Sequence, residues 1–165
     1  MKLKMIAIAL CLMLLAVCAA AETTETMDFQ LGTSALTMKI PNSYVPGDLT
    51  EEDVQHDQVA YMVSSDSLLD FDVYQFTKDG LPETLAEYVQ MEAEEFAATE
   101  VVTDAKINGI DAAYYRTVES YDGEEYATLT YVFEDGEDYL EICFWLDGEN
   151  AEAEVKNILD TLSRK

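Results

Sequence analysis

The chain has few of the residues on which covalent cross-links and nucleophilic catalysis usually depend. Its 165 residues include three cysteines and one histidine. Cys11 and Cys18 lie in an N-terminal apolar stretch, so removal of that stretch would leave Cys143 alone. This excludes an internal disulfide and a cysteine-based structural zinc site. His56 has no G-x-S-x-G motif to pair with, so a serine-hydrolase triad is not indicated.

Basic residues are also scarce. Lysine and arginine number 9 against 34 acidic residues, which gives a formal net charge of −25. A field of this sign repels nucleic acid and anionic membrane surfaces, and it would attract cations or basic partners. The plainer interpretation is a solvated surface that keeps the protein soluble. Weak binding of divalent cations is compatible with this charge, but the sequence contains no EF-hand loop.

The sequence has no apolar run as long as the roughly 20 residues that a transmembrane helix needs. Its longest run, Met5–Val17, follows Lys2 and Lys4 and precedes the small residues Ala19–Ala21. This order is typical of a secretory signal peptide. Cys18 leaves a second possibility open, a lipidated cysteine, although the preceding Val17 departs from the small residue usual in a bacterial lipoprotein box.

These features predict an exported protein that is secreted or associated with the cell envelope. We expect a signal peptide over residues 1–21, a polar tether over residues 22–26 and a single domain over residues 27–165. The mature chain is expected to contain no transmembrane span.

Glycine and proline are few, and several glycines follow Asp or Asn where a tight turn would suit them. Asp122-Gly123 and Asp135-Gly136 separate three β-rich runs between residues 110 and 146, which predicts a three-stranded meander. Two-residue turns at these pairs place Tyr114 opposite Tyr131 and Tyr131 opposite Leu140. Asn108-Gly109 is a further hairpin signal.

Alternating or β-rich runs predict further strands at residues 27–31, 35–40, 59–64, 69–77 and 101–107. Apolar residues at three-four spacing predict two main helices, at about residues 83–97 and 150–162. Thr50 and the acidic residues after it resemble a capping box that opens one or two helical turns. The fold class is therefore α+β, with helices packed on a mainly antiparallel central sheet.

Several of these segments resemble the PsbP-like fold, which also occurs in the Ran-binding MOG proteins. The resemblance is carried by Ile107-Asn108-Gly109, Ala113-Tyr114-Tyr115, Tyr139–Ile142 and the closing helix Val155–Leu162. It implies an α/β/α sandwich over residues 27–163. It also implies a binding or accessory role, because relatives of this type are generally not enzymes. No catalytic or cofactor-binding residue is carried over from the family.

The meander has two unequal faces. One face is apolar apart from Arg116, and the other gathers aromatic and polar side chains. Tyr115, Tyr126, Tyr139 and Trp145 on the second face combine apolar area with polar tips, a composition common at recognition surfaces. This face is a candidate partner-binding surface; alternatively, a helix of the sandwich covers it.

The sequence thus favours an exported, non-enzymatic binding or accessory module that uses no cofactor. Its expected partner is a protein or a small ligand, and a positively charged partner would suit the acidic chain. An exported hydrolase that uses carboxylates and a divalent cation is the alternative, and an acidic cation-binding surface protein is a second one. Cys143 is a poor candidate nucleophile, because a nucleophilic thiol needs a lowered pKa and the neighbouring Glu141 and Thr128 would tend to raise it.

Overall fold

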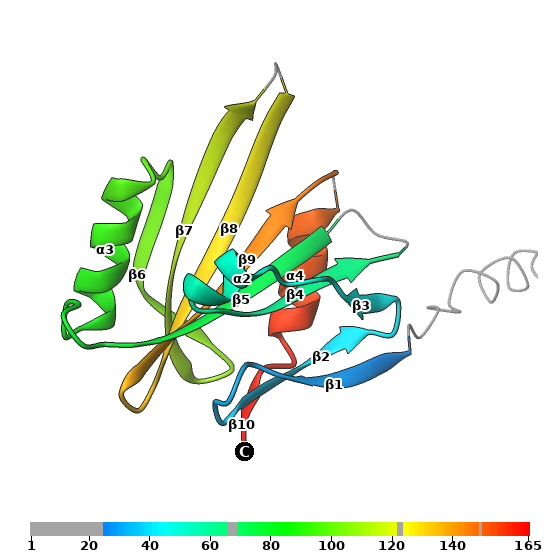
Figure 1. Ribbon diagram of the computed structural model, residues 1–165, viewed down its shortest axis with the longest axis horizontal. Coiled ribbons are helices and arrows are strands. Elements are labelled where there is room, and N and C mark those ends of the chain that lie inside the picture. The colour runs from blue at the N-terminus through cyan, green and yellow to red at the C-terminus, as the bar shows by residue number, and fades with distance from the viewer. Residues whose placement is uncertain (1–24, 66–68, 122–123, 149) are drawn as a thin grey trace, which may run out of the picture.

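The computed structural model describes residues 25–65, 69–121, 124–148 and 150–165. In this part of the chain ten strands and three helices follow one another (Figure 1). The strands are β1 (Thr26–Gln30), β2 (Leu36–Pro41), β3 (Tyr44–Pro46), β4 (Gln58–Ser64), β5 (Leu69–Thr77), β6 (Glu100–Ile107), β7 (Ile110–Tyr121), β8 (Glu124–Asp135), β9 (Asp138–Leu146) and β10 (Ser163–Arg164). The helices are α2 (Glu51–Gln55), α3 (Leu85–Glu95) and α4 (Ala151–Leu159).

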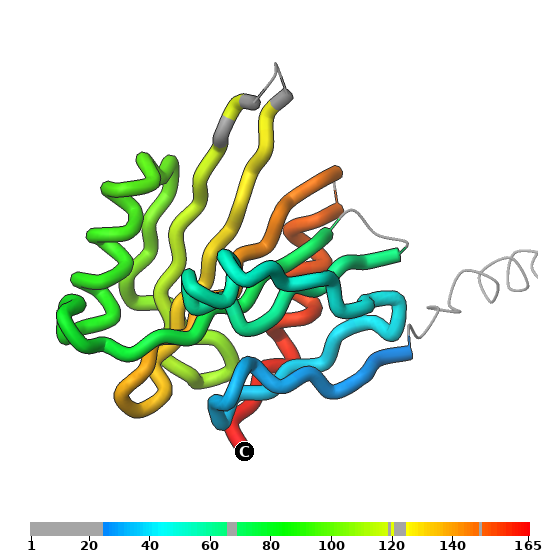
Figure 2. Tube along the Cα trace, in the orientation of Figure 1, coloured from blue at the N-terminus to red at the C-terminus, as the bar shows by residue number. Residues whose placement is uncertain are grey.

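The strands form two antiparallel sheets. The larger sheet has the order β3-β4-β5-β9-β8-β7-β6, and the smaller one has the order β1-β2-β10. The tube in Figure 2 shows the first strands of the chain beside its C-terminal end, which β10 brings against β2. The predicted α+β class with a mainly antiparallel sheet is confirmed.

Other elements pack against each face of the large sheet, so the molecule is built in layers. Leu129, Ile142 and Phe144 of one face pack with β2 and with Val155 and Ile158 of α4. The opposite face packs against α3, through a second and smaller cluster that includes Val89, Ala93 and Val132. In Figure 1, α3 stands beside β6, and α4 lies behind the sheet; α3 also contacts β7. This is the sandwich that the sequence predicts.

The predicted helices are confirmed as α3 and α4, each a few residues shorter than expected. The capping box at Thr50 is present, with its hydroxyl accepting from the Asp53 N–H and the Asp53 carboxylate accepting from the Thr50 N–H. β5 has the predicted bounds. β3 and β10 were not predicted, because strands of two or three residues at a sheet edge form through pairing and leave no periodic pattern.

One predicted register is confirmed and the other is wrong. β7 and β8 pair Tyr114 with Tyr131 as expected, although the Asp122-Gly123 turn itself lies outside the described residues. β8 and β9 pair Tyr131 with Ile142 rather than Leu140. Gly136, with a φ of +66°, takes the first central position of that turn, and Asp135 pairs with Asp138. The shift is two residues, so every side chain keeps its predicted face.

Asp135 lies at the end of β8, outside the centre of the turn, and its carboxylate binds distant parts of the chain. It accepts a hydrogen bond from the backbone N–H of Ala35 at 2.9 Å and another from Arg164. These bonds tie the β8–β9 hairpin to the small sheet. The β6–β7 turn, in contrast, uses Asn108 and Gly109 with positive φ at both, as the Asn-Gly signal predicts.

Candidate functional site: an acidic groove beside α3

The second face of the large sheet is divided between a covered half and an open half. α3 buries the covered half, where Tyr115 is 4% exposed and Tyr139 is fully buried. The Tyr139 hydroxyl donates to the carbonyl of Pro82 at 2.7 Å. Tyr126 and Trp145 lie in the open half and are 42% and 44% exposed. The helix α3 therefore makes Tyr115 and Tyr139 unavailable to a partner, whereas Tyr126 and Trp145 stay exposed and remain candidates for partner binding.

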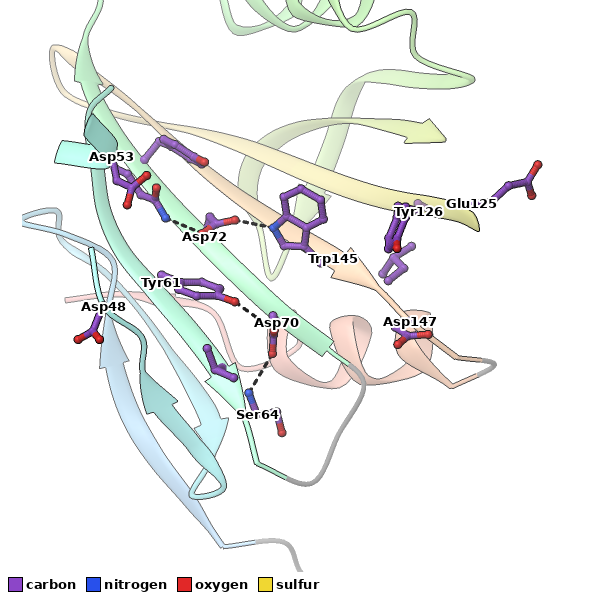
Figure 3. A pocket seen from close by; sticks show the side chains of 15 residues that line it. Asp48, Asp53, Tyr61, Ser64, Asp70, Asp72, Glu125, Tyr126, Trp145 and Asp147 are labelled. Carbon is purple, nitrogen blue, oxygen red and sulfur yellow. Dashed lines mark hydrogen bonds between the residues drawn. The ribbon is translucent and has the colours of Figure 1, made fainter. Parts of the chain in front are cut away.

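The open half forms a groove of about 900 Å³, which we call the acidic groove (Figure 3). Six carboxylate residues line it: Asp48, Asp53, Asp70, Asp72, Glu125 and Asp147. Four aromatic residues line it with them: Tyr61, Tyr74, Tyr126 and Trp145. No lysine, arginine or histidine is among its described lining residues. The groove therefore offers negative charge and aromatic surface together.

Strand alternation explains why these side chains meet. Asp70, Asp72 and Tyr74 stand at every second position of β5 and so point to one face. The pairing of β5 with β9 sets Asp70 opposite Trp145, and the pairing with β4 sets Asp72 opposite Tyr61. β4 and β5 are consecutive in the sequence, but β9 is far from both, so the position of Trp145 beside Asp70 and Asp72 is a product of sheet order. α2 adds Asp53 from above the sheet.

Asp72 is the most enclosed carboxylate of the groove, with 6% of its surface exposed. Its two oxygens accept from the Gln58 amide and from the Trp145 indole N–H, as the dashed lines in Figure 3 show. Burial raises the pKa of Asp72, and the negative charges of Asp53 and Asp70 raise it further, while the two hydrogen bonds act in the opposite direction. The environment of this carboxylate thus lacks positive charge.

Asp70 is held more loosely beside it. One of its oxygens accepts from the backbone N–H of Ser64 at 3.1 Å, and the other accepts from the Tyr61 hydroxyl at 3.3 Å. Burial raises the pKa of Tyr61, and Asp70 adds to the effect, so Tyr61 stays protonated as a donor. Tyr61, Gln58 and Trp145 therefore fix the orientation of both carboxylates without neutralising either of them.

Glu141 is a second buried carboxylate on this face, under α3 instead of in the groove. It is 8% exposed and accepts from the Tyr88 hydroxyl at 2.7 Å. Burial raises the pKa of Glu141 to about 7, and the nearby charge of Glu92 adds to the shift. Across the strand pair it stands opposite Tyr74, which lines the groove. Glu141 thus adjoins the groove from its covered side.

The remaining residues singled out in the sequence take no part in this groove. His56 is exposed at the end of α2. Burial raises the pKa of Cys143 to about 12, so its thiol is protonated at neutral pH and is a poor nucleophile. The candidate lipidation site, Cys18, lies outside the described residues.

The described residues lack two further kinds of feature. They contain no group of three or more His, Cys, Asp or Glu side chains placed to hold a metal ion. Among their helices, none combines the length and apolarity that spanning a bilayer would require.

Sequence reasoning identified Trp145 and Tyr126 but missed Asp70, Asp72 and Gln58 as members of one site. The alternation of β5 was a usable signal, because it places both aspartates on one face. The missing information was the β5–β9 pairing, which no short turn specifies.

No protein-family model and no curated protein matches the chain. Solved structures do match it. CyanoP, the cyanobacterial PsbP of Synechocystis sp. PCC 6803, aligns with a TM-score of 0.58 at 9% identity, over 90% of this chain and 97% of its own. A protein from Bacteroides thetaiotaomicron VPI-5482 aligns with a TM-score of 0.56 at 16% identity, over 82% of this chain. The alignment covers 49% of that protein, so the chain spans about half its length. The chain has a PsbP-like fold.

Proposed function

We propose that the protein is a non-enzymatic binding module whose acidic groove takes a positively charged segment of a partner protein. One observation carries this proposal: Asp72 is buried at the floor of an open groove with neutral hydrogen-bond donors and no cation. A buried carboxylate is costly unless a positive charge or a proton compensates it. The PsbP-like fold also supports an accessory or binding role, although it does not indicate which ligand is bound.

Charge complementarity selects the occupant of the groove. Acidic residues lie along the groove from Asp53 and Asp72 at one end to Glu125 and Asp147 at the other (Figure 3). A basic segment would meet carboxylates along this length, and the overall charge of −25 would speed its approach. The exposed rings of Tyr126 and Trp145 supply the apolar contact area that aromatic residues contribute at interfaces.

The test is a binding titration with a lysine-containing synthetic peptide against its glutamate-containing counterpart. Trp145→Ala should weaken binding of the lysine peptide by about tenfold or more, since tryptophan is a frequent hot-spot residue. Phe96→Ala is the matched control, because Phe96 is 47% exposed at the end of α3, outside the groove. Equal affinity for both peptides would contradict the proposal.

Export is part of the same proposal, because the N-terminal stretch has the order of a signal peptide. Mass spectrometry of protein from the producing cell should find a mature N-terminus near Glu22. A mature N-terminus at a lipid-modified Cys18 would show anchoring to the envelope, and an intact Met1 would contradict export.

A second function is favoured by a specific feature of the groove. Asp70 and Asp72 face the same cleft, and the raised pKa of Asp72 would suit a proton donor beside a second carboxylate. A carboxylate-dependent hydrolase would use this pair. The test is an assay with model ester, peptide and glycoside substrates. Hydrolysis by the wild type that is lost in both Asp72→Asn and Asp70→Asn would favour this function over binding alone.

A further inference from the structure

The acidic groove contains one position where a single positive charge would be held most strongly. Six ion pairs occur among the described residues, and they use Asp28, Glu134, Asp111, Glu152, Asp160 and Asp135. Asp72 is in none of them, although it is far more deeply buried than the exposed members of these pairs. Its negative charge is therefore uncompensated in the part of the chain that the structure describes.

Asp72 also keeps capacity to accept further hydrogen bonds. A carboxylate offers about four lone-pair positions on its two oxygens. Gln58 occupies one position on Oδ1, and Trp145 occupies one on Oδ2. Both donors approach from within the sheet face, from β4 and β9 on either side of β5. The remaining positions are left for a donor that enters from the groove.

We propose that Asp72 is the subsite for the primary ammonium group of a lysine side chain carried by the partner segment, with Trp145 beside the lysine stem. This subsite rests on the proposed function and specifies which basic residue the groove selects.

A lysine ammonium fits the subsite better than the other common cations. It is a compact charge with three rotatable donors, so it can bond to one oxygen of Asp72 at a time. The planar guanidinium of arginine makes its best contact with a carboxylate that is open across both oxygens, whereas Asp72 is only 6% exposed and already has a donor on each oxygen. A quaternary ammonium has no N–H to donate. A calcium ion needs six to eight oxygens, far more than one carboxylate supplies.

The surroundings of Asp72 support this choice. The Trp145 indole is bound to Asp72 through its N–H, which places the ring edge at the subsite, and the side chain is 44% exposed to the groove. Aliphatic stems of lysine pack well on such apolar surface while the ammonium remains at a polar group. The raised pKa of Asp72 would return toward its ordinary value when a cation is bound.

Trp145 provides a direct readout, because it is the single tryptophan of the chain. Its fluorescence is followed while the full protein is titrated with a short peptide carrying lysines at alternate positions. Matched peptides carry arginine, trimethyllysine or norleucine at the same positions. We expect the lysine peptide to bind about tenfold more tightly than the arginine and trimethyllysine peptides, with no saturable binding of the norleucine peptide.

Two variants separate the subsite from the general charge of the groove. Asp72→Asn removes the charge and keeps one of the two acceptor oxygens, so it should weaken binding of the lysine peptide about tenfold or more and abolish the preference for lysine. Asp147→Asn removes one exposed charge of the groove. It should change the affinity for the lysine peptide by less than about threefold, and the preference for lysine over arginine and trimethyllysine should remain. Circular dichroism confirms that both variants are folded.

The outcomes distinguish the subsite from the proposed function. If arginine or trimethyllysine peptides bind as tightly as lysine, or if both variants weaken binding equally, the groove binds basic segments but Asp72 is not an ammonium subsite. If no basic peptide binds the wild-type protein, the proposed function is wrong and the subsite falls with it.

Discussion

Asp72 and Glu141 are two buried carboxylates on one face of the large sheet. Neither has a cationic partner in the part of the chain that the structure describes, and their surroundings differ. Asp72 opens to the groove and receives two neutral donors. Glu141 lies under α3 and receives one donor, Tyr88. Asp72 lines the groove that a ligand would enter, whereas Glu141 is not among the lining residues of the groove. Protonation is therefore the available way to relieve the charge of Glu141, and its pKa near 7 makes this relevant at physiological pH.

The stability of the protein should therefore fall as the pH rises through the titration range of Glu141. Its pKa is about 7 in the folded state against a model value of 4.5, so the folded protein binds more protons than the unfolded chain in this range. The free energy of unfolding then decreases between about pH 4.5 and 7 and levels off above it. Glu141→Gln removes this contribution and keeps an acceptor for Tyr88.

We expect Glu141→Gln to be more stable than the wild type by up to roughly 3 kcal/mol at pH 8, and by little at pH 4.5. Urea unfolding of both proteins across this pH range measures the difference. Asp72 also has a raised pKa, but it is present in both proteins and cancels in the comparison. Glu92 is present in both proteins as well, but its charge helps to raise the pKa of Glu141, so the difference between the proteins reports this coupled pair. Glu92→Gln, which is only half-buried, is the control and should give a smaller gain. A variant less stable than the wild type at pH 8 would contradict the prediction.

At the scale of elements, hairpins are anchored to distant parts of the chain by single side chains. Asp135 joins the β8–β9 hairpin to β2 and β10. Asn108 similarly joins the β6–β7 turn to the end of α4, where its amide donates to the carbonyls of Asp160 and Leu162. Turn residues thus help to hold the two sheets and α4 in one body.

Asp135→Ala should destabilise the protein by about 1–3 kcal/mol, because the backbone N–H of Ala35 loses its acceptor and Arg164 loses its partner. Glu137→Ala is the matched control, since Glu137 is an exposed acidic residue in the same turn. We expect a change within about 0.5 kcal/mol for the control. Chemical denaturation of both variants checks the prediction. An equal loss in the free energy of unfolding would mean that the bonds of Asp135 to Ala35 and Arg164 do not contribute to stability.

The elements were predictable where local patterns determine them. β5 has its predicted bounds because its alternation is regular and Asp79-Gly80 follows it. The two faces of the meander were predictable because a two-residue shift in register preserves them. The groove was not predictable, because it depends on the pairing of β5 with β9, two strands that no turn joins. Tyr115 and Trp145 are alike in sequence pattern, and the position of α3 alone separates them.

At the scale of the whole molecule, charge is the dominant property. A net charge of −25 on one domain creates repulsion that opposes the compact state. Three of the six ion pairs join two exposed side chains, and each of these contributes little to stability. The hydrophobic clusters on the two faces of the large sheet must therefore supply most of the stability.

Added salt should stabilise the protein by screening this repulsion. We expect the Tm to rise steadily as sodium chloride increases toward about 0.1 M and above, where the Debye length falls to about 10 Å. Differential scanning fluorimetry measures this rise. A Tm that falls or stays constant would mean that repulsion between carboxylates does not limit stability.

Calcium tests whether the acidic surface also contains a dedicated cation site. Because the described residues place no three metal-ligating side chains together, we expect millimolar calcium and magnesium chloride to raise the Tm equally. A dedicated calcium site would instead give a rise that saturates with calcium and exceeds that with magnesium, since ligand binding to the folded state shifts unfolding by mass action. Such a result would favour the cation-binding alternative. Repeating the titration with Asp72→Asn would then show whether the groove or another part of the surface holds the ion.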